Sequence, residues 1–400
     1  MNFALLGDDL AVLPVVQAIK DHPQHDLTHA ALASTLQAEL MTSAPSVRIV
    51  DGWEDLMAAA SVDAVLVAGS SPAVLEGAKQ LAASGIPLLL FPRAEQEATL
   101  IYELSLIHDD INVPLFPVIP LRFHSKLKQV RELIQSGVLG AILHMQMQRE
   151  VQTGNDKQPS SLLSWADVDA ALLQDADLLR SLGGHYNRVT ALAAGTVEDR
   201  FALMTVTLAG DNLPEATWSL KTVSSQAGWQ LSLTAENGSV LLSGENDPSS
   251  ITLKTEGVEL SSNPDSESEN GIGSEILAQF EKAVTGQSAQ PNWTGLMRAF
   301  ETVEATHRSV RRRRTIELHF ESQSERSLFK TQMTAIGCGV LTLTFFAVLV
   351  VLLIGAMFDP EKMSQGTVLA MKIARIAVFM PVFLFLLFQL LLFITRPSSS

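Results

Sequence analysis

His185 is the residue of this sequence whose chemistry is most useful near neutral pH. An imidazole has an ordinary pKa of ~6.5, so it can accept or donate a proton in general acid–base catalysis. A histidine with no nearby lysine or aspartate is more often an interior residue or a ligand contact, and both interpretations stay open. His22, His25 and His29 are too irregularly spaced for zinc, and we expect no metal. The sequence has no Walker loop, nucleophile elbow or H-E-x-x-H motif.

The first 110 residues alternate short apolar strands with helices. The expected strands are Asn2–Leu6, Thr28–Ala33, Val62–Ala68 and Ile86–Phe91, and the expected helices are Leu10–Lys20 and Ala73–Ser84. This alternation predicts an α/β fold with a parallel, doubly wound, Rossmann-like sheet over residues 1–115. Its ligand crevice would lie at the carboxyl ends of the strands.

A different pattern begins at about residue 116. Helices are expected at Ser125–Ser136, through a stretch ending at His185, and at Ile276–Val284 and Thr294–Arg308; strands are expected at Ala141–Glu150, Arg200–Leu208, Ala216–Val223, Trp229–Ala235 and Ser239–Ser243. Asn237-Gly238 predicts a hairpin turn, and residues 261–270 a polar, acidic loop. The pattern predicts an α+β domain over residues 116–322 with a mostly antiparallel sheet.

The charge and cysteine content exclude some classes of protein. A formal charge of −15 argues against a nucleic-acid partner, which needs a basic surface. Cys338 is the single cysteine, which rules out a disulfide framework and suits a reducing cytosol. The residues after Met1 lack the basic region of a signal peptide, so we expect the bulk of the protein to stay in the cytoplasm.

Two apolar stretches lie near the end of the chain. Residues 335–357 and 376–394 are each close to the ~20 residues that cross a bilayer, and a short polar turn separates them. This pattern predicts a transmembrane helical hairpin over 335–396, after a juxtamembrane linker at 323–334. The partner is then the lipid bilayer, and the protein is a multi-pass protein of the cytoplasmic (inner) membrane. Basic residues in the amino-terminal flank, among them Arg311 to Arg314, favour a large domain facing the cytoplasm.

Five sequence blocks, in order, are similar to those of one enzyme family. They are Val62-Asp63-Ala64-Val65 leading to Gly85, Leu121-Arg122-Phe123 leading to Gly140, Gly183-Gly184-His185, the hairpin Trp229–Leu242, and Glu301–Leu318. In these blocks the chain resembles the Gfo/Idh/MocA family of oxidoreductases over roughly residues 1–320. The resemblance implies binding of NAD or NADP by the first domain and hydride transfer at a sugar or polyol carbon.

The resemblance implies a cofactor site that is altered in this chain. The phosphate loop should read G-x-G-x-x-G/A, but here it reads Gly7-Asp8-Asp9-Leu10-Ala11-Val12, with one glycine of the three. Asp9 would place a carboxylate against the pyrophosphate, and Asp8 or Asp9 would more simply cap the first helix. The remaining cofactor positions implied by the resemblance are Ser34, where an acid should bind ribose, and Ala68, Ser70 and Arg93.

The catalytic positions are altered as well. The family's E-K-P segment corresponds to Phe91-Pro92-Arg93, so the catalytic lysine is absent. Arg93 keeps its proton near neutral pH, so it could orient a ligand but could not replace a titrating lysine. In the family's D-x-G-x-H segment, Ser181 replaces the aspartate while Gly183 and His185 remain. His185 is therefore the one catalytic candidate.

Two functions compete. The first is a catalytically degenerate pseudo-oxidoreductase that serves as a ligand-binding or scaffolding module, with a sugar-like ligand, a protein partner or a second copy of itself. The second is an active NAD(P)-dependent sugar or polyol oxidoreductase with an atypical site. A transporter is disfavoured because the apolar stretches hold no acidic residue.

Overall fold

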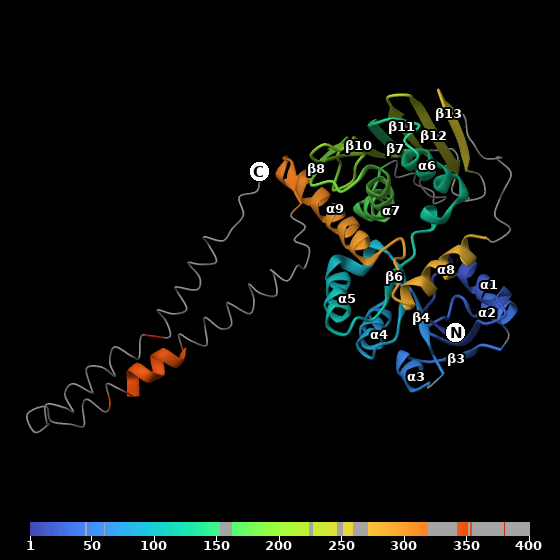
Figure 1. Cartoon of the computed structure of the whole chain (residues 1–400), viewed down its shortest axis with the longest axis vertical. Coiled ribbons are helices and arrows are strands. Elements are labelled where there is room, and N and C mark those ends of the chain that lie inside the picture. Colours follow the sequence, from blue (N-terminus) through green and yellow to red (C-terminus); the bar gives the residue numbers. More distant parts are fainter. Residues whose placement is uncertain are drawn as a thin grey trace, which may run out of the picture. The chain divides into compact units, whose positions relative to one another are not determined.

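A computed structural model describes residues 1–44, 46–59, 61–152, 162–223, 227–245, 251–258, 271–318, 342–350, 353 and 380. The chain divides into two compact units, Met1–His319 and Phe320–Ser400. Figure 1 shows the elements of the first unit, which holds both sheets. The polar loop expected at residues 261–270 lies outside the described residues.

Sheet A is a parallel sheet of six strands in the order β3-β2-β1-β4-β5-β6. The strands are β1 Asn2–Gly7, β2 Asp26–Ala31, β3 Arg48–Val50, β4 Ala64–Ala68, β5 Leu88–Phe91 and β6 Leu115–Pro117. The helices between them are α1 Leu13–Asp21, α2 Gln37–Ser43, α3 Trp53–Ala58, α4 Pro72–Ala83 and α5 Glu97–Ile111. This strand order is that of a Rossmann-like dinucleotide-binding sheet, as predicted.

One expected helix of this region divides in two. Residues 10–20 form a single helical turn η1, Leu10–Val12, and then α1 from Leu13. Pro14 stands in the first turn of α1, where its missing N–H costs nothing. The break places the amino end of η1 directly after β1, so Asp9 takes the capping position.

Sheet B has eight strands in the order β13-β12-β11-β7-β10-β9-β8-β14. The strands are β7 Ile142–Gln152, β8 Arg188–Ala194, β9 Leu203–Ala209, β10 Glu215–Val223, β11 Gly228–Ala235, β12 Gly238–Glu245, β13 Thr252–Glu256 and β14 Ile316–Glu317. The pairing of β10 with β7 is parallel and the other pairings are antiparallel. Sheet B is therefore a mixed sheet, close to the mostly antiparallel one predicted.

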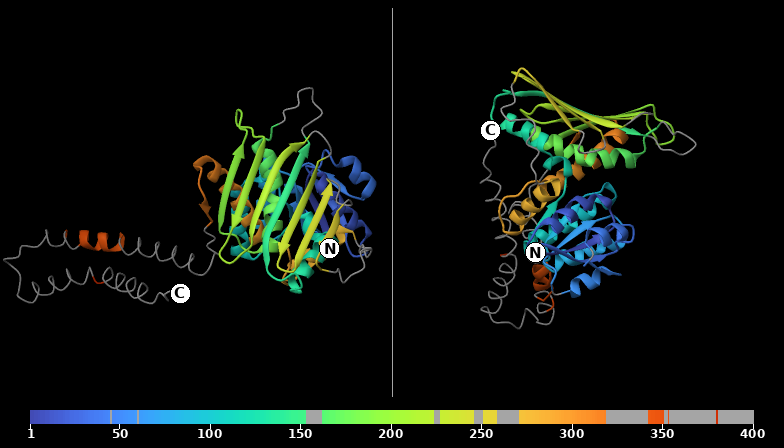
Figure 2. Two further views of the ribbon diagram at one scale, coloured as in Figure 1. Left: turned by 90° about the horizontal axis from the view of Figure 1, so that it is seen from above. Right: turned by 90° about the vertical axis from the view of Figure 1, so that its right-hand side faces the viewer.

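The helices of the second half are α6 Ser125–Gln135, α7 Trp165–Gly183, α8 Ile272–Val284 and α9 Trp293–Arg312. Helix α7 packs on β7 and β10, and α9 packs on α7 and β8. The right-hand view of Figure 2 shows sheet B edge-on, with helices on the face toward sheet A and none of the described helices on the other. Helix α7 ends before His185, which therefore lies in the connection to β8 and not in the helix that we expected.

Helix α8 packs somewhere other than expected. The sequence placed it with the closing helices of the second domain, but it packs against α1, and Ile276, Leu277 and Phe280 belong to the core of sheet A. The Phe280 ring lies 6.1 Å from the rings of both Phe3 and Phe116. The amphipathic pattern of a helix identifies its buried face but not the element that covers it.

The two apolar stretches near the end of the chain fall largely outside the described residues. In the described part, residues 342–350 are helical. Among the described residues, no helix combines the length and the apolar character needed to cross a membrane.

Candidate functional site

The carboxyl ends of β1 and β4 meet at Gly7 and Ala68, which are paired residues of the two strands. Gly7 has φ +109°, and a Cβ at this position would collide with the carbonyl oxygen of Ala68. Gly69, which follows Ala68 at the end of β4, has φ +156°. The two strand ends therefore approach so closely that only glycine fits at position 7.

Replacing Gly7 with alanine is expected to lower the free energy of unfolding by at least about 2 kcal/mol, because backbone strain and overpacking add. Gly85→Ala is the matched control, since Gly85 also has positive φ, +81°, but open space around it. Its expected cost is about 1 kcal/mol. Denaturant unfolding of both variants checks this, and equal costs would contradict the close approach of β1 and β4.

Asp9 binds its own loop and a residue from β5. Its Oδ1 accepts a hydrogen bond from the Ala11 N–H at 2.9 Å, so the prediction of an aspartate cap is confirmed for Asp9, on η1. Its Oδ2 is ion-paired with the guanidinium of Arg93, which donates through Nε and Nη2. The Asp9 side chain is only 11 % exposed, whereas that of Arg93 is 44 % exposed.

The charges of two side chains of the expected cofactor site, Asp9 and Arg93, thus neutralise each other. Asp9 stands at the second glycine of the phosphate loop, and Arg93 lies in the segment that corresponds to the family's E-K-P. The amino end of η1, which should receive a phosphate anion, already holds a carboxylate. At the third glycine position, Val12 is fully buried. These residues do not fit a pyrophosphate group.

The other predicted cofactor residues lie around this pair. The Ala68 carbonyl accepts a hydrogen bond from the Asp9 N–H at 3.2 Å. Leu10 and Ser34 are exposed and Ser70 is half-buried. The β2 loop that carries Ser34 touches the phosphate loop, because the Thr35 hydroxyl donates to the Asp8 carbonyl at 2.8 Å.

Gln96 is a residue of this region that the sequence did not reveal. It lies in η2, Ala94–Gln96, and is 1 % exposed. Its Nε2 donates to the carbonyl oxygens of Gly69 and Phe91 at 2.9 and 3.1 Å, and its Oε1 accepts from the Arg93 N–H at 3.1 Å. One amide thereby joins the ends of β4 and β5 and holds the backbone of Arg93 in place.

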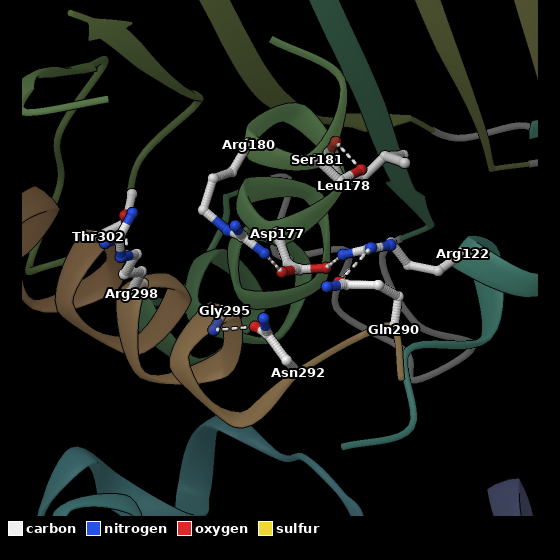
Figure 3. A network of polar contacts seen from close by, with 10 residues as sticks. All are labelled: Arg122, Asp177, Leu178, Arg180, Ser181, Gln290, Asn292, Gly295, Arg298 and Thr302. Carbon is white, nitrogen blue, oxygen red and sulfur yellow. Dashed lines mark hydrogen bonds and ion pairs between the residues drawn. The ribbon is translucent and has the colours of Figure 1, made fainter. Parts of the chain in front are cut away.

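A second polar group lies at the carboxyl half of α7. Asp177 is completely buried and accepts hydrogen bonds from Arg122 at 2.8 Å and from Arg180 at 2.6 Å. Figure 3 shows the two guanidinium groups reaching its carboxylate from different sides. Ser181, at the family's aspartate position, donates instead to the Leu178 carbonyl of its own helix at 2.7 Å. The carboxylate of this region therefore belongs to Asp177, one helical turn earlier.

His185 lies within electrostatic range of two cationic side chains, Arg298 and Arg180. Burial, and then the charges of Arg298 and Arg180, lower the pKa of His185 below its ordinary value. The imidazole is therefore neutral at neutral pH, which allows it to accept a proton. Helix α7, which precedes His185, packs against η2, which follows Arg93.

We expect NMR to show His185 titrating below ~6.5, because two guanidinium groups and burial oppose its protonation. As the pH falls through ~6.5, the unfolded chain gains a proton that the folded chain does not, so His185 lowers folding stability there. His185→Asn should therefore lose less stability between neutral and acidic pH than the unchanged chain. Titration of the His185 ring at or above ~6.5 would contradict the placement of Arg180 and Arg298.

Another buried carboxylate supports sheet B. Asp175 is fully buried. Its carboxylate accepts two hydrogen bonds from the Arg149 guanidinium, at 2.7 and 2.5 Å, and one from the Trp218 Nε1–H at 2.8 Å. All of its partners come from strands, so this contact fastens α7 to β7 and β10. Among the described residues, no group of histidine, cysteine, aspartate or glutamate side chains could hold a metal ion.

No family model and no curated protein matches the chain. Solved structures do match. A myo-inositol dehydrogenase from Corynebacterium glutamicum is 17% identical with a TM-score of 0.62, over 80% of this chain and 99% of that one. The WlbA dehydrogenase from Bordetella pertussis, solved with NADH and UDP-GlcNAcA, is 17% identical with a TM-score of 0.63, over 80% and 98%. An oxidoreductase from Agrobacterium radiobacter, solved with NAD+, L-tartaric acid and magnesium, is 15% identical with a TM-score of 0.62, over 79% and 98%.

These matches cover nearly the whole of each solved chain and about four fifths of this one. At such identities they show the fold. The chain therefore shares the fold of these solved dehydrogenases, which is the kind of fold that the five sequence blocks predict.

Proposed function

We propose that this chain is a catalytically degenerate member of the dehydrogenase fold that serves as a ligand-binding or scaffolding module. The observation that carries the proposal is the ion pair of Asp9 with Arg93. The Asp9 carboxylate occupies the place of the phosphate. The segment that should supply a proton-donating lysine offers only Arg93, which stays charged. The loss of an aspartate at Ser181 points the same way, because the Ser181 hydroxyl is engaged within its own helix.

An active NAD(P)-dependent oxidoreductase on a sugar or polyol is the second candidate. The structural neighbours solved with NADH or NAD+ favour it, as do the glycine at Gly7 and the neutral imidazole of His185. For this function the Asp9 carboxylate and the Arg93 guanidinium would have to separate and leave the phosphate loop when a cofactor binds.

A turnover assay distinguishes the two candidates. The full-length chain, solubilised in detergent, is incubated with NAD+ or NADP+ and a panel of polyols and sugars, and the absorbance of reduced nicotinamide is followed. If the chain is a non-catalytic module, we expect no rise in absorbance above that of a protein-free control. Turnover that disappears in His185→Asn would establish the oxidoreductase.

We further propose that residues 335–357 and 376–394 anchor the chain in the cytoplasmic membrane, with the large domain in the cytoplasm. The apolar sequence supports this, and so does the helical stretch 342–350, where the side chains of Leu343, Phe345 and Phe346 are 66%, 64% and 61% exposed. Apolar side chains so exposed suit contact with lipid. We expect the chain to sediment with membranes and to resist alkaline carbonate; recovery in the soluble fraction would contradict the anchor.

The partners of the module belong to the same proposal. They are a sugar-like ligand, another protein or a second copy of this chain. Sheet B leaves one face without a covering helix among the described residues, which suits a second copy. Light scattering of the detergent-solubilised chain tests this, and a monomeric mass would exclude a stable homo-oligomer.

A further inference from the structure

We propose that Arg122, Arg131, Arg180 and Arg298, together with His185, form a binding site for the oxyanion group, a carboxylate or a phosphate, of a small molecule. The four arginines are called the arginine cluster below. The inference deepens the proposed function, on which it rests, by naming the chemical class of the ligand of the module.

The arginine cluster is assembled from four separate elements. Arg122 lies in η3, Pro120–Phe123, Arg131 in α6, Arg180 in α7 and Arg298 in α9. Helix α6 packs on η3, and α7 packs on α9. Arg131 lies within electrostatic range of Arg122 and Asp177, and Arg298 within range of Arg180. The cluster is therefore continuous from α6 to α9, with Asp177 at its centre.

Positive charge is in excess here. Asp177 pairs with Arg122 and Arg180 and also acts on Arg131, and Glu301 lies within electrostatic range of Arg298. The whole chain carries a formal charge of −15, so a local excess of cations is not a consequence of composition. The mutual repulsion is reflected in lowered pKa values for Arg131, Arg298 and His185, after the larger effect of burial in each. An anion would relieve this repulsion.

Several donors of the cluster have no acceptor. The Nη2 of Arg131, the Nε of Arg122 and the Nε of Arg180 are buried and make no hydrogen bond with the described residues. Buried donors are nearly always satisfied in folded proteins, so three in one place require an explanation. The Nη1 and Nη2 groups of Arg122 are meanwhile held by Asp177 and by Gln290, the latter at 3.3 Å.

The surrounding backbone leaves room for this arrangement. A Cβ at Gly295, in the first turn of α9, would collide with the Nη2 of Arg180. The Gly295 N–H is held at 2.8 Å by the Oδ1 of Asn292, the capping residue of α9, as Figure 3 shows. The glycine thus keeps space beside Asp177 for the guanidinium of Arg180. Guanidinium groups so held present planar donors that match the two oxygens of a carboxylate or phosphate.

The test is binding of simple anions to the full-length chain in detergent, without nucleotide. Glucuronate tests for a carboxylate site, and glucose 6-phosphate and inorganic phosphate test for a phosphate site. Glucose is the uncharged control, and the ionic strength is the same in all titrations. We expect saturable calorimetric binding of at least one acid and none of glucose. The acid that binds identifies the anion.

Variants assign the binding to the cluster. Arg131→Gln removes a guanidinium that does not hold Asp177, and we expect at least a tenfold loss of affinity, with Arg131→Lys retaining part of it. Arg188→Gln is the matched control, because Arg188 pairs with Asp211 outside the cluster and is 44 % exposed. Thermal melting without ligand verifies that each variant is folded. Absence of binding by all three acids, or equal affinity of Arg131→Gln and Arg188→Gln, would overturn the site while leaving the nucleotide results of the proposed function unaffected.

Discussion

Asp9→Gly is expected to strengthen the binding of NADH to the full-length chain by about a hundredfold or more. A carboxylate ~4 Å from a phosphate repels it by about 4 kcal/mol at an effective dielectric constant of ~20, close to a thousandfold in affinity. The Asp9 side chain is 11 % exposed, so water that reaches its carboxylate screens part of this repulsion. The substitution also releases Arg93, which then adds an attractive charge at the same strand end. Calorimetric titration of the variant and the unchanged chain measures the difference.

Two controls separate charge from loop flexibility. Asp8→Gly makes the same change at the neighbouring residue and keeps the Asp9–Arg93 pair, so it should leave the affinity nearly unchanged. Asp9→Asn keeps a side-chain oxygen for the Ala11 N–H and removes the charge, so it should recover most of the gain. An Asp9→Gly chain that binds no better than the unchanged chain would show that Asp9 does not close the loop.

Asp177→Asn is expected to lower the free energy of unfolding by about 3–5 kcal/mol. The substitution leaves Arg122, 6 % exposed, and Arg180, 14 % exposed, without their counter-charge in a buried place. The added amide N–H would also face donors of both guanidinium groups. The midpoint of thermal unfolding should fall by roughly 6 to 15 °C.

Asp211→Asn is the matched control for this loss. Asp211 pairs with Arg188 at 3.2 Å, but its side chain is 79 % exposed. An exposed pair contributes little, so the change should stay within about 0.5 kcal/mol. Equal unfolding temperatures for Asp177→Asn and the unchanged chain would refute a structural role of the buried carboxylate.

The centre of the parallel sheet could be predicted, but its edges could not. Strands β1 and β4 are buried almost throughout, so they read as continuous apolar runs. The edge strands β3 and β6 have three residues each, too few for any periodicity. Strand β8 was missed for another reason, because its outward positions include Leu192 and Ala194, so its sequence shows little alternation of apolar and polar residues.

The loss of two glycines from the phosphate loop could be predicted from the sequence, but the ion pair of Asp9 with Arg93 could not. Asp9 and Arg93 are 84 residues apart in the chain, and only the parallel pairing of β1 with β4 and of β4 with β5 brings them together. Asp177 was missed because an acid within a helix resembles a solvent-facing residue until its partner is known. Its partner Arg122 lies 55 residues earlier, and no local pattern connects the two.

The most direct test of the central claim is calorimetric titration of the unchanged full-length chain with NAD+, NADH, NADP+ and NADPH. If the Asp9–Arg93 pair occupies the phosphate loop, none of the four should bind at concentrations up to about 1 mM. A dissociation constant in the micromolar range for any of them would contradict the closed loop and establish a working cofactor site.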